Sequence, residues 1–367
     1  MGRATDVFVI GGGPAGLAAA IAARKRGMEV VVADGAEPPI DKACGEGLMP
    51  DTLSALRDLG VSVNPAEGFA FRGIRFLGER AQVEGNFPFG EGIGLRRPVL
   101  HEKMIAQAQR LGVTLLWKTS VSGLSPEGAI AGGKTIAARW VVGADGIRSR
   151  VRRWCGLESP ALPRPRYAFR RHYRVAPWTD CMEIYWGRNA QAYVTPVGRQ
   201  DLCVVVMSRN ASVRSTSLAA DFPKLAEQLA SAEASPENGA VTLTCGFDRV
   251  YRDRVALIGD ASGSVDAITG EGLCLSFHQA AALADALECG DLSRYQAAHR
   301  RLARRPTLMG RLLLLLDRQP RVRQRAMHAL AKHPDLFARL LAVHVGATSP
   351  GHLAATGAQL GWRFVVA

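Results

Sequence analysis

The sequence lacks several features that would assign its class at once. No apolar run approaches the ~20 residues that a membrane-spanning helix needs, and the longest candidate, residues 312–316, is far too short. No basic-then-apolar leader precedes the first apolar segment, and neither internal repeats nor low-complexity segments are evident. We therefore expect a globular protein located in the cytoplasm.

Cysteine gives no sign of disulfide or metal chemistry. The seven cysteines are odd in number and scattered, with neither a Cys-x-x-Cys pair nor Cys/His ligand spacing. This pattern favours a reducing compartment over a disulfide framework, and we predict no bound metal.

Acidic residues are few relative to basic ones, which gives a formal net charge of +13. The basic residues are overwhelmingly arginine, and no nucleic-acid-binding motif accompanies them, so we predict no nucleic-acid partner. Many of the arginines crowd around residues 312–316. Two interpretations stay open for this basic segment: a cap with a solvated arginine face, or a surface in peripheral contact with an anionic membrane.

One strong pattern stands near the start of the chain. Residues 7–10 form a short, β-branched apolar run that predicts a buried strand. The strand leads into Gly-Gly-Gly-Pro-Ala-Gly at residues 11–16, which matches G-x-G-x-x-G and opens a helix. A second buried strand over residues 29–33 ends at Asp34. This order of strand, glycine-rich turn, helix, strand and acidic residue is typical of dinucleotide binding.

Each residue type in the turn has a physical role. Gly11 permits the tight turn, and Gly13 lacks a Cβ, so a pyrophosphate can approach the backbone. Gly16 lets the helix pack closely on the strands, while Pro14 and Ala15 begin the helix, whose free N–H groups favour an anion. The acidic side chain that ends the second strand, Asp34, is placed to accept hydrogen bonds from a ribose hydroxyl.

The rest of the chain predicts further elements. Strands over residues 71–76, 82–87, 167–175, 182–186, 192–196 and 202–207 have the composition of an antiparallel sheet. Helices are predicted over residues 99–111, 218–232 and 272–287. A basic helical region over residues 292–341 is expected to break at Pro306, Pro320 and Pro334.

Two further strand-to-turn motifs complete a set of three: Gly-Ala-Asp-Gly at residues 143–146 and Ile-Gly-Asp-Ala at residues 258–261. This set resembles the FAD-binding fold shared by aromatic hydroxylases of the p-hydroxybenzoate hydroxylase type, geranylgeranyl reductases and flavin-dependent halogenases. The resemblance implies an α/β fold: an FAD-binding Rossmann-like domain of the glutathione-reductase type, an antiparallel-sheet substrate domain and a C-terminal helical segment. We place these parts at residues 1–70 with 97–160 and 246–290, at residues 71–96 with 161–245, and at residues 291–367.

The resemblance also implies which residues hold FAD. Asp145 and Gly146 shape the region beside the pyrophosphate, and Gly259 with Asp260 faces the ribityl and pyrophosphate side. Arg97 matches an arginine near the FAD phosphates, with Arg96 as the competing assignment, and the backbone of Val121 touches adenine. The remaining implied residues lie beside the flavin ring, in a loop and in a turn: Cys44, Gly45, Gly270, Glu271, Gly272 and Leu273. Where these families usually carry Pro in that turn, this chain has Ala267.

The chemistry is left between two flavin reactions. A single-component monooxygenase would hydroxylate an aromatic or polyketide-like molecule with NAD(P)H and O₂ through a flavin C4a-hydroperoxide, whereas a geranylgeranyl-reductase-like enzyme would saturate C=C bonds of a lipophilic substrate. The loop at residues 42–48 is similar to that of the reductases, but Tyr193 stands where their lipid-tunnel motif has Trp. We therefore favour oxygenation, keep reduction as the alternative and a non-catalytic flavin-binding protein as the second. The halogenase motif Trp-x-Trp-x-Ile-Pro is not found.

The substrate is expected to be an aromatic or lipophilic small molecule, and NAD(P)H to bind only transiently, because the chain carries a single G-x-G-x-x-G. No catalytic residue can be fixed from the sequence, and neither can the oligomeric state. The candidates are polar or aromatic residues of the loop and of the predicted antiparallel strands: Cys44, Glu46, Arg171, Tyr185 and Tyr193. Either Arg171 or its neighbour His172 could bond a phenolate or carboxylate.

Overall fold

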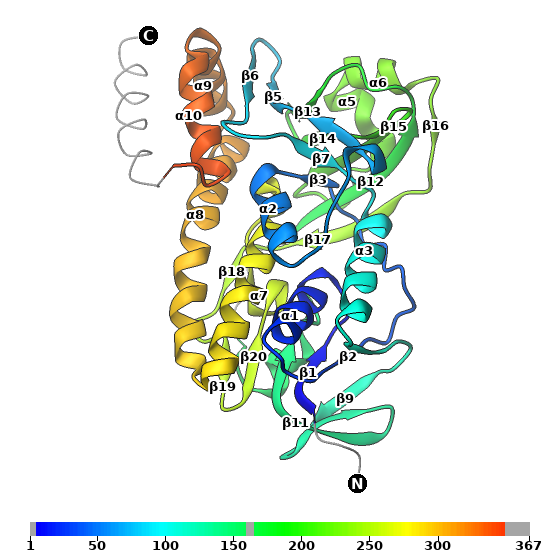
Figure 1. The fold of residues 1–367 in the computed structure, drawn as a ribbon. Coiled ribbons are helices and arrows are strands. Elements are labelled where there is room, and N and C mark those ends of the chain that lie inside the picture. Colours follow the sequence, from blue (N-terminus) through cyan, green and yellow to red (C-terminus); the bar gives the residue numbers. More distant parts are fainter. Residues whose placement is uncertain (1–4, 159–164, 349–367) are drawn as a thin grey trace.

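A parallel sheet forms the lower half of the molecule as drawn in Figure 1, in the computed structural model, which describes residues 5–158 and 165–348. Its strands in spatial order are β19 (Tyr251–Arg252), β20 (Val255–Leu257), β11 (Lys134–Gly143), β1 (Thr5–Ile10), β2 (Val30–Ala33) and β8 (Thr114–Leu116). All neighbours pair in parallel except β19 with β20. The antiparallel strands β10 (Gly128–Ala131) and β9 (Val121–Leu124) extend from β11.

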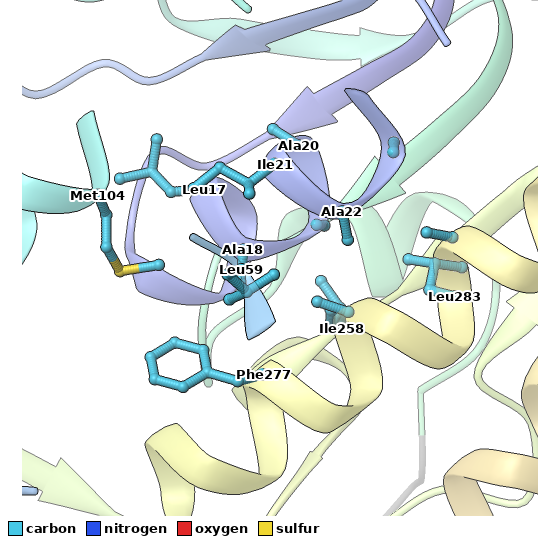
Figure 2. Packing of buried hydrophobic residues seen from close by; sticks show 14 of the residues in the cluster. Leu17, Ala18, Ala20, Ile21, Ala22, Leu59, Met104, Ile258, Phe277 and Leu283 are labelled. Atoms are coloured by element: carbon cyan, nitrogen blue, oxygen red, sulfur yellow. The ribbon is translucent and has the colours of Figure 1, made fainter. Parts of the chain in front are cut away.

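Three helices with small or apolar faces pack beside this sheet: α1 (Pro14–Lys25), α3 (Arg97–Arg110) and α7 (Gly272–Cys289). Figure 2 shows Ala18 and Ala22 on the side of α1 toward α7, which carries Phe277 and Leu283, and Leu17 beside Met104 of α3, all in one buried cluster. The alanines of α1 leave room for this close packing, because their side chains end at Cβ. The glycine-rich turn is thereby held between a rigid strand and a rigid helix.

A mainly antiparallel sheet forms the second layer (Figure 1). Its strand order is β16 (Glu233–Ala234), β12 (Arg166–Arg174), β15 (Asp201–Ser208), β14 (Ala190–Gly198), β13 (Cys181–Trp186), β5 (Gly73–Leu77) and β6 (Gln82–Asn86), with β17 (Asn238–Thr242) also paired to β12. One face packs against α5 (Leu218–Asp221) and α6 (Pro223–Leu229). The other packs against α9 (Pro320–Lys332) and α10 (Pro334–His344).

The smaller elements connect the two layers. They are β3 (Gly47–Leu48), β4 (Phe69–Phe71), β7 (Gly92–Gly94), β18 (Cys245–Gly246), β21 (Gly263–Ser264), α2 (Pro50–Asp58), α4 (Arg150–Trp154) and four 3₁₀ turns among the described residues, η1 (Pro65–Glu67), η2 (Ser215–Ser217), η3 (Gly259–Ser262) and η4 (Ala267–Thr269). No helix in residues 5–158 and 165–348 is long and apolar enough to cross a membrane.

Two helix predictions are wrong. The break expected at Pro306 does not occur, since α8 (Leu292–Arg318) continues through this residue. A proline inside a helix costs about 3 kcal/mol, and here Pro306 is buried, so packing offsets part of that cost. The single helix expected over residues 218–232 is instead divided, because Phe222 is non-helical and Pro223 starts α6.

The predicted fold class is confirmed: a Rossmann-like parallel sheet, an antiparallel sheet and C-terminal helices are all present. The exact domain boundaries remain a prediction. Residues 1–4, 159–164 and 349–367 of the predicted domains lie outside the described residues.

Candidate active site

The three predicted motifs meet at one edge of the parallel sheet. Ile10 pairs with Gly143, and Gly143 pairs with Leu257, so β1, β11 and β20 end side by side. The glycine-rich turn, the turn at residues 143–146 and η3 therefore leave the sheet together. Ligands of open α/β sheets bind outside this carboxyl edge.

The glycines of the first turn divide into two kinds. Gly11 has φ +112°, and a Cβ on Gly16 would lie 1.9 Å from the carbonyl oxygen of Gly11, so neither position accepts a side chain. A Cβ on Gly13, in contrast, would meet no atom within 4 Å. The fold itself therefore requires glycine at positions 11 and 16, whereas Gly13 leaves free space at the N-terminus of α1.

Open space recurs at glycines of three other segments. A Cβ on Gly45, Gly146 or Gly272 would likewise meet nothing within 4 Å. Gly272 is also the first residue of α7, whose free N–H groups favour negative charge. The predicted contact segments thus leave room for an extended phosphate-bearing group, and the residues present fit FAD.

Asp34 lies at the same edge, beside the glycine-rich turn. Its carboxylate accepts hydrogen bonds from the backbone N–H groups of Gly12 at 2.7 Å and Ala36 at 2.8 Å. The ring of Trp117 lies against Gly12, and Val121 is buried at the start of β9. Hydrogen bonds from Gly12 and Ala36 therefore hold the carboxylate of Asp34 beside the glycine-rich turn.

The start of α3 brings cations and a buried histidine to the turn. Arg97 is the first residue of α3, and the Nε atoms of Arg96 and Arg97 have no hydrogen-bond partner. Nδ1 of His101 accepts from the backbone N–H of Ile40 at 3.0 Å, so its Nε2–H donates to the carbonyl oxygen of Gly12 at 2.7 Å. Burial lowers the pKa of His101, which agrees with this neutral form. The sequence analysis gave His101 no role.

The two motif aspartates differ in what they contact. The Asp145 carboxylate accepts hydrogen bonds from the hydroxyl of Ser149 and from the N–H groups of Arg150 and Val151, and so holds the start of α4. The half-exposed Asp260 side chain lies 3.8 Å from Nζ of Lys42. Asp260 therefore has more capacity to contact a ligand than Asp145.

The turn before α7 can offer its backbone to a ligand, because the side chain of Glu271 points toward the C-terminal helices. Gly270 is left-handed at φ +67°, and Leu273 packs on the core. The carboxylate of Glu271 is buried, 3.1 Å from Arg305 and 3.6 Å from His344, and burial raises its pKa. Glu271 thus connects the turn to the C-terminal helices.

The loop at residues 41–48 contributes Asp41 and Glu46 to a cluster of charged side chains. Glu46 has φ +59°, and its fully buried carboxylate lies 2.7 Å from Nε2 of His172 and 3.3 Å from the guanidinium of Arg170. Arg170 also binds both carboxylate oxygens of Asp41, at 2.7 and 2.8 Å. The backbone N–H of Arg97 donates to Glu46 at 3.0 Å. This loop therefore joins the nucleotide side to β12 of the second sheet.

Two cysteines flank this cluster. The thiol of Cys203 lies 3.5 Å from the carbonyl oxygen of Cys44, and burial raises the pKa of Cys203 well above its usual value. Ligand-type atoms of Glu46, His172 and Cys203 lie within 4.8 Å of one another. The positive charge of Arg170 beside them opposes a cation, so we interpret the cluster as a hydrogen-bonded charge network.

The structure does not bring all five catalytic candidates together. Cys44 and Glu46 lie in the loop, and the hydroxyl of Tyr193 donates to the carbonyl oxygen of Ile268 in η4 at 3.2 Å. Tyr185 instead packs with Phe222 on the face covered by α5 and α6. Arg171 is on the same side, next to Tyr173 of that cluster.

Of the two alternatives Arg171 and His172, His172 lies on the side of Glu46, together with Arg170. Successive side chains of β12 alternate between faces, and both Arg170 and His172 contact Glu46. The sequence analysis gave no role to Arg170 or Asp41. The i, i+2 spacing of Arg170 and His172 was the available signal, but it does not say which face is the inner one.

Comparison with known proteins gives a family and two curated relatives. A family model described as FAD binding domain matches residues 4–290. Menaquinone reductase of Mycobacterium tuberculosis is 27% identical over 323 residues, which covers 79% of this chain and 78% of that protein. Digeranylgeranylglycerophospholipid reductase 1 of Methanopyrus kandleri is 30% identical over 298 residues, with 73% and 76% covered.

Solved structures match over nearly the whole chain. A flavin-dependent brominase has a TM-score of 0.81 at 17% identity, covering 98% of this chain and 100% of its own. A geranylgeranyl bacteriochlorophyll reductase-like protein of Thermoplasma acidophilum has a TM-score of 0.75 at 20% identity, covering 96% and 99%. At these identities the likeness is one of fold.

Proposed function

Because this chain belongs to the FAD binding domain family of FAD-dependent oxidoreductases, we propose that it is a reductase that saturates C=C bonds of a lipophilic substrate. Its similarity to menaquinone reductase and to digeranylgeranylglycerophospholipid reductase supports this proposal. These relatives shift our preference from the oxygenation favoured by the sequence to the reduction kept as its alternative.

The structural observation that supports the proposal is that apolar side chains surround the turn before α7, which is predicted to lie along the flavin ring. Ile268 of that turn and Tyr193 belong to one buried cluster with side chains of α9 and α10, among them Met327, Leu330 and Phe337. A substrate that leaves the turn in this direction meets apolar side chains. A lipophilic chain suits these surroundings, because its transfer from water is favourable.

FAD, when bound, supplies hydride chemistry, and we propose NAD(P)H as its transient electron donor. The protein's contribution is position and protons. The N-termini of α1 and α7 favour phosphate and negative charge. His172 keeps one ring nitrogen on Glu46, and its Nδ1 has no partner among the described residues, so this atom can hold and release a proton.

Oxygenation is the second candidate. Its support is the fold, since a probable FAD-dependent monooxygenase of Pseudomonas aeruginosa has a TM-score of 0.71 at 23% identity. The same flavin position serves both reactions, so fold likeness alone does not separate them.

The proposal is tested with purified holoenzyme, NAD(P)H and two probes, a geranylgeranyl lipid and a simple phenol. We expect bound flavin to bleach anaerobically with NADH or NADPH and the lipid to gain two hydrogen atoms. A gain of one oxygen atom, with O₂ uptake above the substrate-free rate, would instead establish oxygenation. Flavin that neither nicotinamide reduces would indicate a non-catalytic flavin-binding protein.

We also propose peripheral contact with an anionic membrane through α8. Leu308, Leu312 and Leu315 are exposed at helical spacing, with arginines on the same helix. Replacing Leu312 and Leu315 by Gln should weaken co-sedimentation with phosphatidylglycerol vesicles. Equal sedimentation of the variant and the parent protein would remove this proposal.

A further inference from the structure

A cavity of about 430 Å³ lies between α9 and the turn that joins β5 to β6. Figure 1 shows α9 beside this hairpin, at the end of the long helix α8. None of its lining residues is a predicted FAD contact. Its wall is partly apolar, formed by Ala81, Trp186, Met327 and Ala329.

A buried cation stands against this wall. Arg323 is 8% exposed, and its guanidinium lies over the ring of Trp186 at 5.8 Å. It donates hydrogen bonds to the carbonyl oxygens of Gly187 at 2.9 Å and Leu316 at 3.4 Å. Among the described residues no carboxylate lies within ion-pair distance of Arg323, although Asp317 and Glu79 interact with it electrostatically, and burial lowers the pKa of Arg323. A buried guanidinium without a direct ion pair is costly, which favours an anion from outside the chain.

Two further observations point to the same ligand class. The indole N–H of Trp186 is buried and has no hydrogen-bond partner, although this residue lines the cavity. The rim adds three exposed cations, Arg80, Arg325 and Lys332, and a single carboxylate, Glu79. The cationic side chains and the unpaired indole N–H lie beside an apolar wall. This arrangement suits a ligand that combines an anionic group with an apolar group.

We propose that this cavity binds the phosphate group of a lipid-like ligand, with the phosphate at the rim cations and Arg323 and the apolar part against Trp186 and Met327. Guanidinium groups bind phosphate by charge-assisted hydrogen bonds. The phosphate can belong to a free phosphorylated ligand or to a bilayer headgroup. The inference does not rest on the proposed reduction, because it requires no redox step.

The test uses FAD-loaded full-length protein, a rim variant and a matched control variant. The first combines Arg325→Gln and Lys332→Gln, both at exposed positions of α9. The matched control combines Arg57→Gln and Lys134→Gln, which removes two exposed cations elsewhere. Inorganic pyrophosphate is titrated calorimetrically, and sedimentation is compared with phosphatidylglycerol and phosphatidylcholine vesicles.

We expect the rim variant to bind pyrophosphate or phosphatidylglycerol vesicles at least tenfold more weakly than the control does. Loss of pyrophosphate binding identifies a free phosphorylated ligand, and loss of vesicle binding alone identifies a bilayer headgroup. Equal binding by the rim variant and the parent protein, or an equal loss in the control, overturns the proposal. The absorbance of bound FAD and the circular dichroism should be unchanged in both variants, so a folding defect is recognised separately.

Discussion

At the scale of single residues, different glycines of the glycine-rich turn are expected to matter for folding and for FAD binding. Gly13→Ala places a methyl group in open space, so the flavin-free protein should keep its stability while its FAD affinity falls at least tenfold. Gly16→Ala places the methyl 1.9 Å from Gly11, and we expect it to destabilise the flavin-free protein by about 1–3 kcal/mol. Urea unfolding without FAD and a fluorescence titration with FAD measure the two effects. Unchanged FAD affinity in Gly13→Ala would contradict the predicted phosphate position.

His172 offers a second contrast between neighbouring residues. In His172→Gln the amide can still donate to Glu46 but cannot carry a proton, so turnover should fall about 10²-fold with flavin content unchanged. Arg171→Gln is the matched control, because it lies on the opposite face of β12 and should leave turnover near that of the parent. Similar losses in both variants would show that His172 has no role of its own.

The same pair of residues shows what the sequence could predict at the scale of elements. The three strand ends and their turns were predictable, because buried β-branched runs before Gly-Gly-Gly, Gly-Ala-Asp-Gly and Ile-Gly-Asp-Ala leave little freedom. The inner face of β12 was not predictable, since a slip of one residue exchanges Arg171 for Arg170 and His172. The contact of Glu46 with these two side chains spans more than 120 positions in the sequence, which no local pattern records.

Helix packing shows the same limit. Proline alone does not predict where a helix begins or ends. Pro223 starts α6, yet Pro306 lies inside α8. Local chemistry sets the cost of the proline, and the packing of the buried residue, unknown from the sequence, decides the outcome.

A buried ion pair fastens α7 to the C-terminal helices. Arg305→Met would leave the buried Glu271 carboxylate with His344 alone, and we expect a loss of about 3 kcal/mol in the free energy of unfolding. Adding Glu271→Gln should restore part of it, because the unpaired charge is then removed. Arg304→Met, at the adjacent exposed position, is the control. A double-mutant cycle with no coupling between Arg305 and Glu271 would refute this role.

At the scale of the whole molecule, the loop at residues 41–48 links the two sheets. Lys42 approaches Asp260 on the nucleotide side, while Asp41 and Glu46 bind Arg170 of β12. The predicted FAD contacts extend along the same line, from the glycine-rich turn to the turn before α7. If these predictions hold, a single ligand contacts segments that the ion pairs of this loop also connect.

Removing FAD should loosen these segments together. At a free FAD concentration of 100 times its Kd, the ligand adds about 2.7 kcal/mol to the free energy of unfolding, which disappears in the flavin-free protein. Amide hydrogen exchange should then accelerate at residues 11–16, 41–48 and 270–273, while exchange in α9 stays unchanged, because no predicted FAD contact lies there. Mass spectrometry of peptides from the two forms measures this difference. If exchange rises equally in α9, FAD acts on global stability alone, and the loop does not transmit its binding to the second sheet.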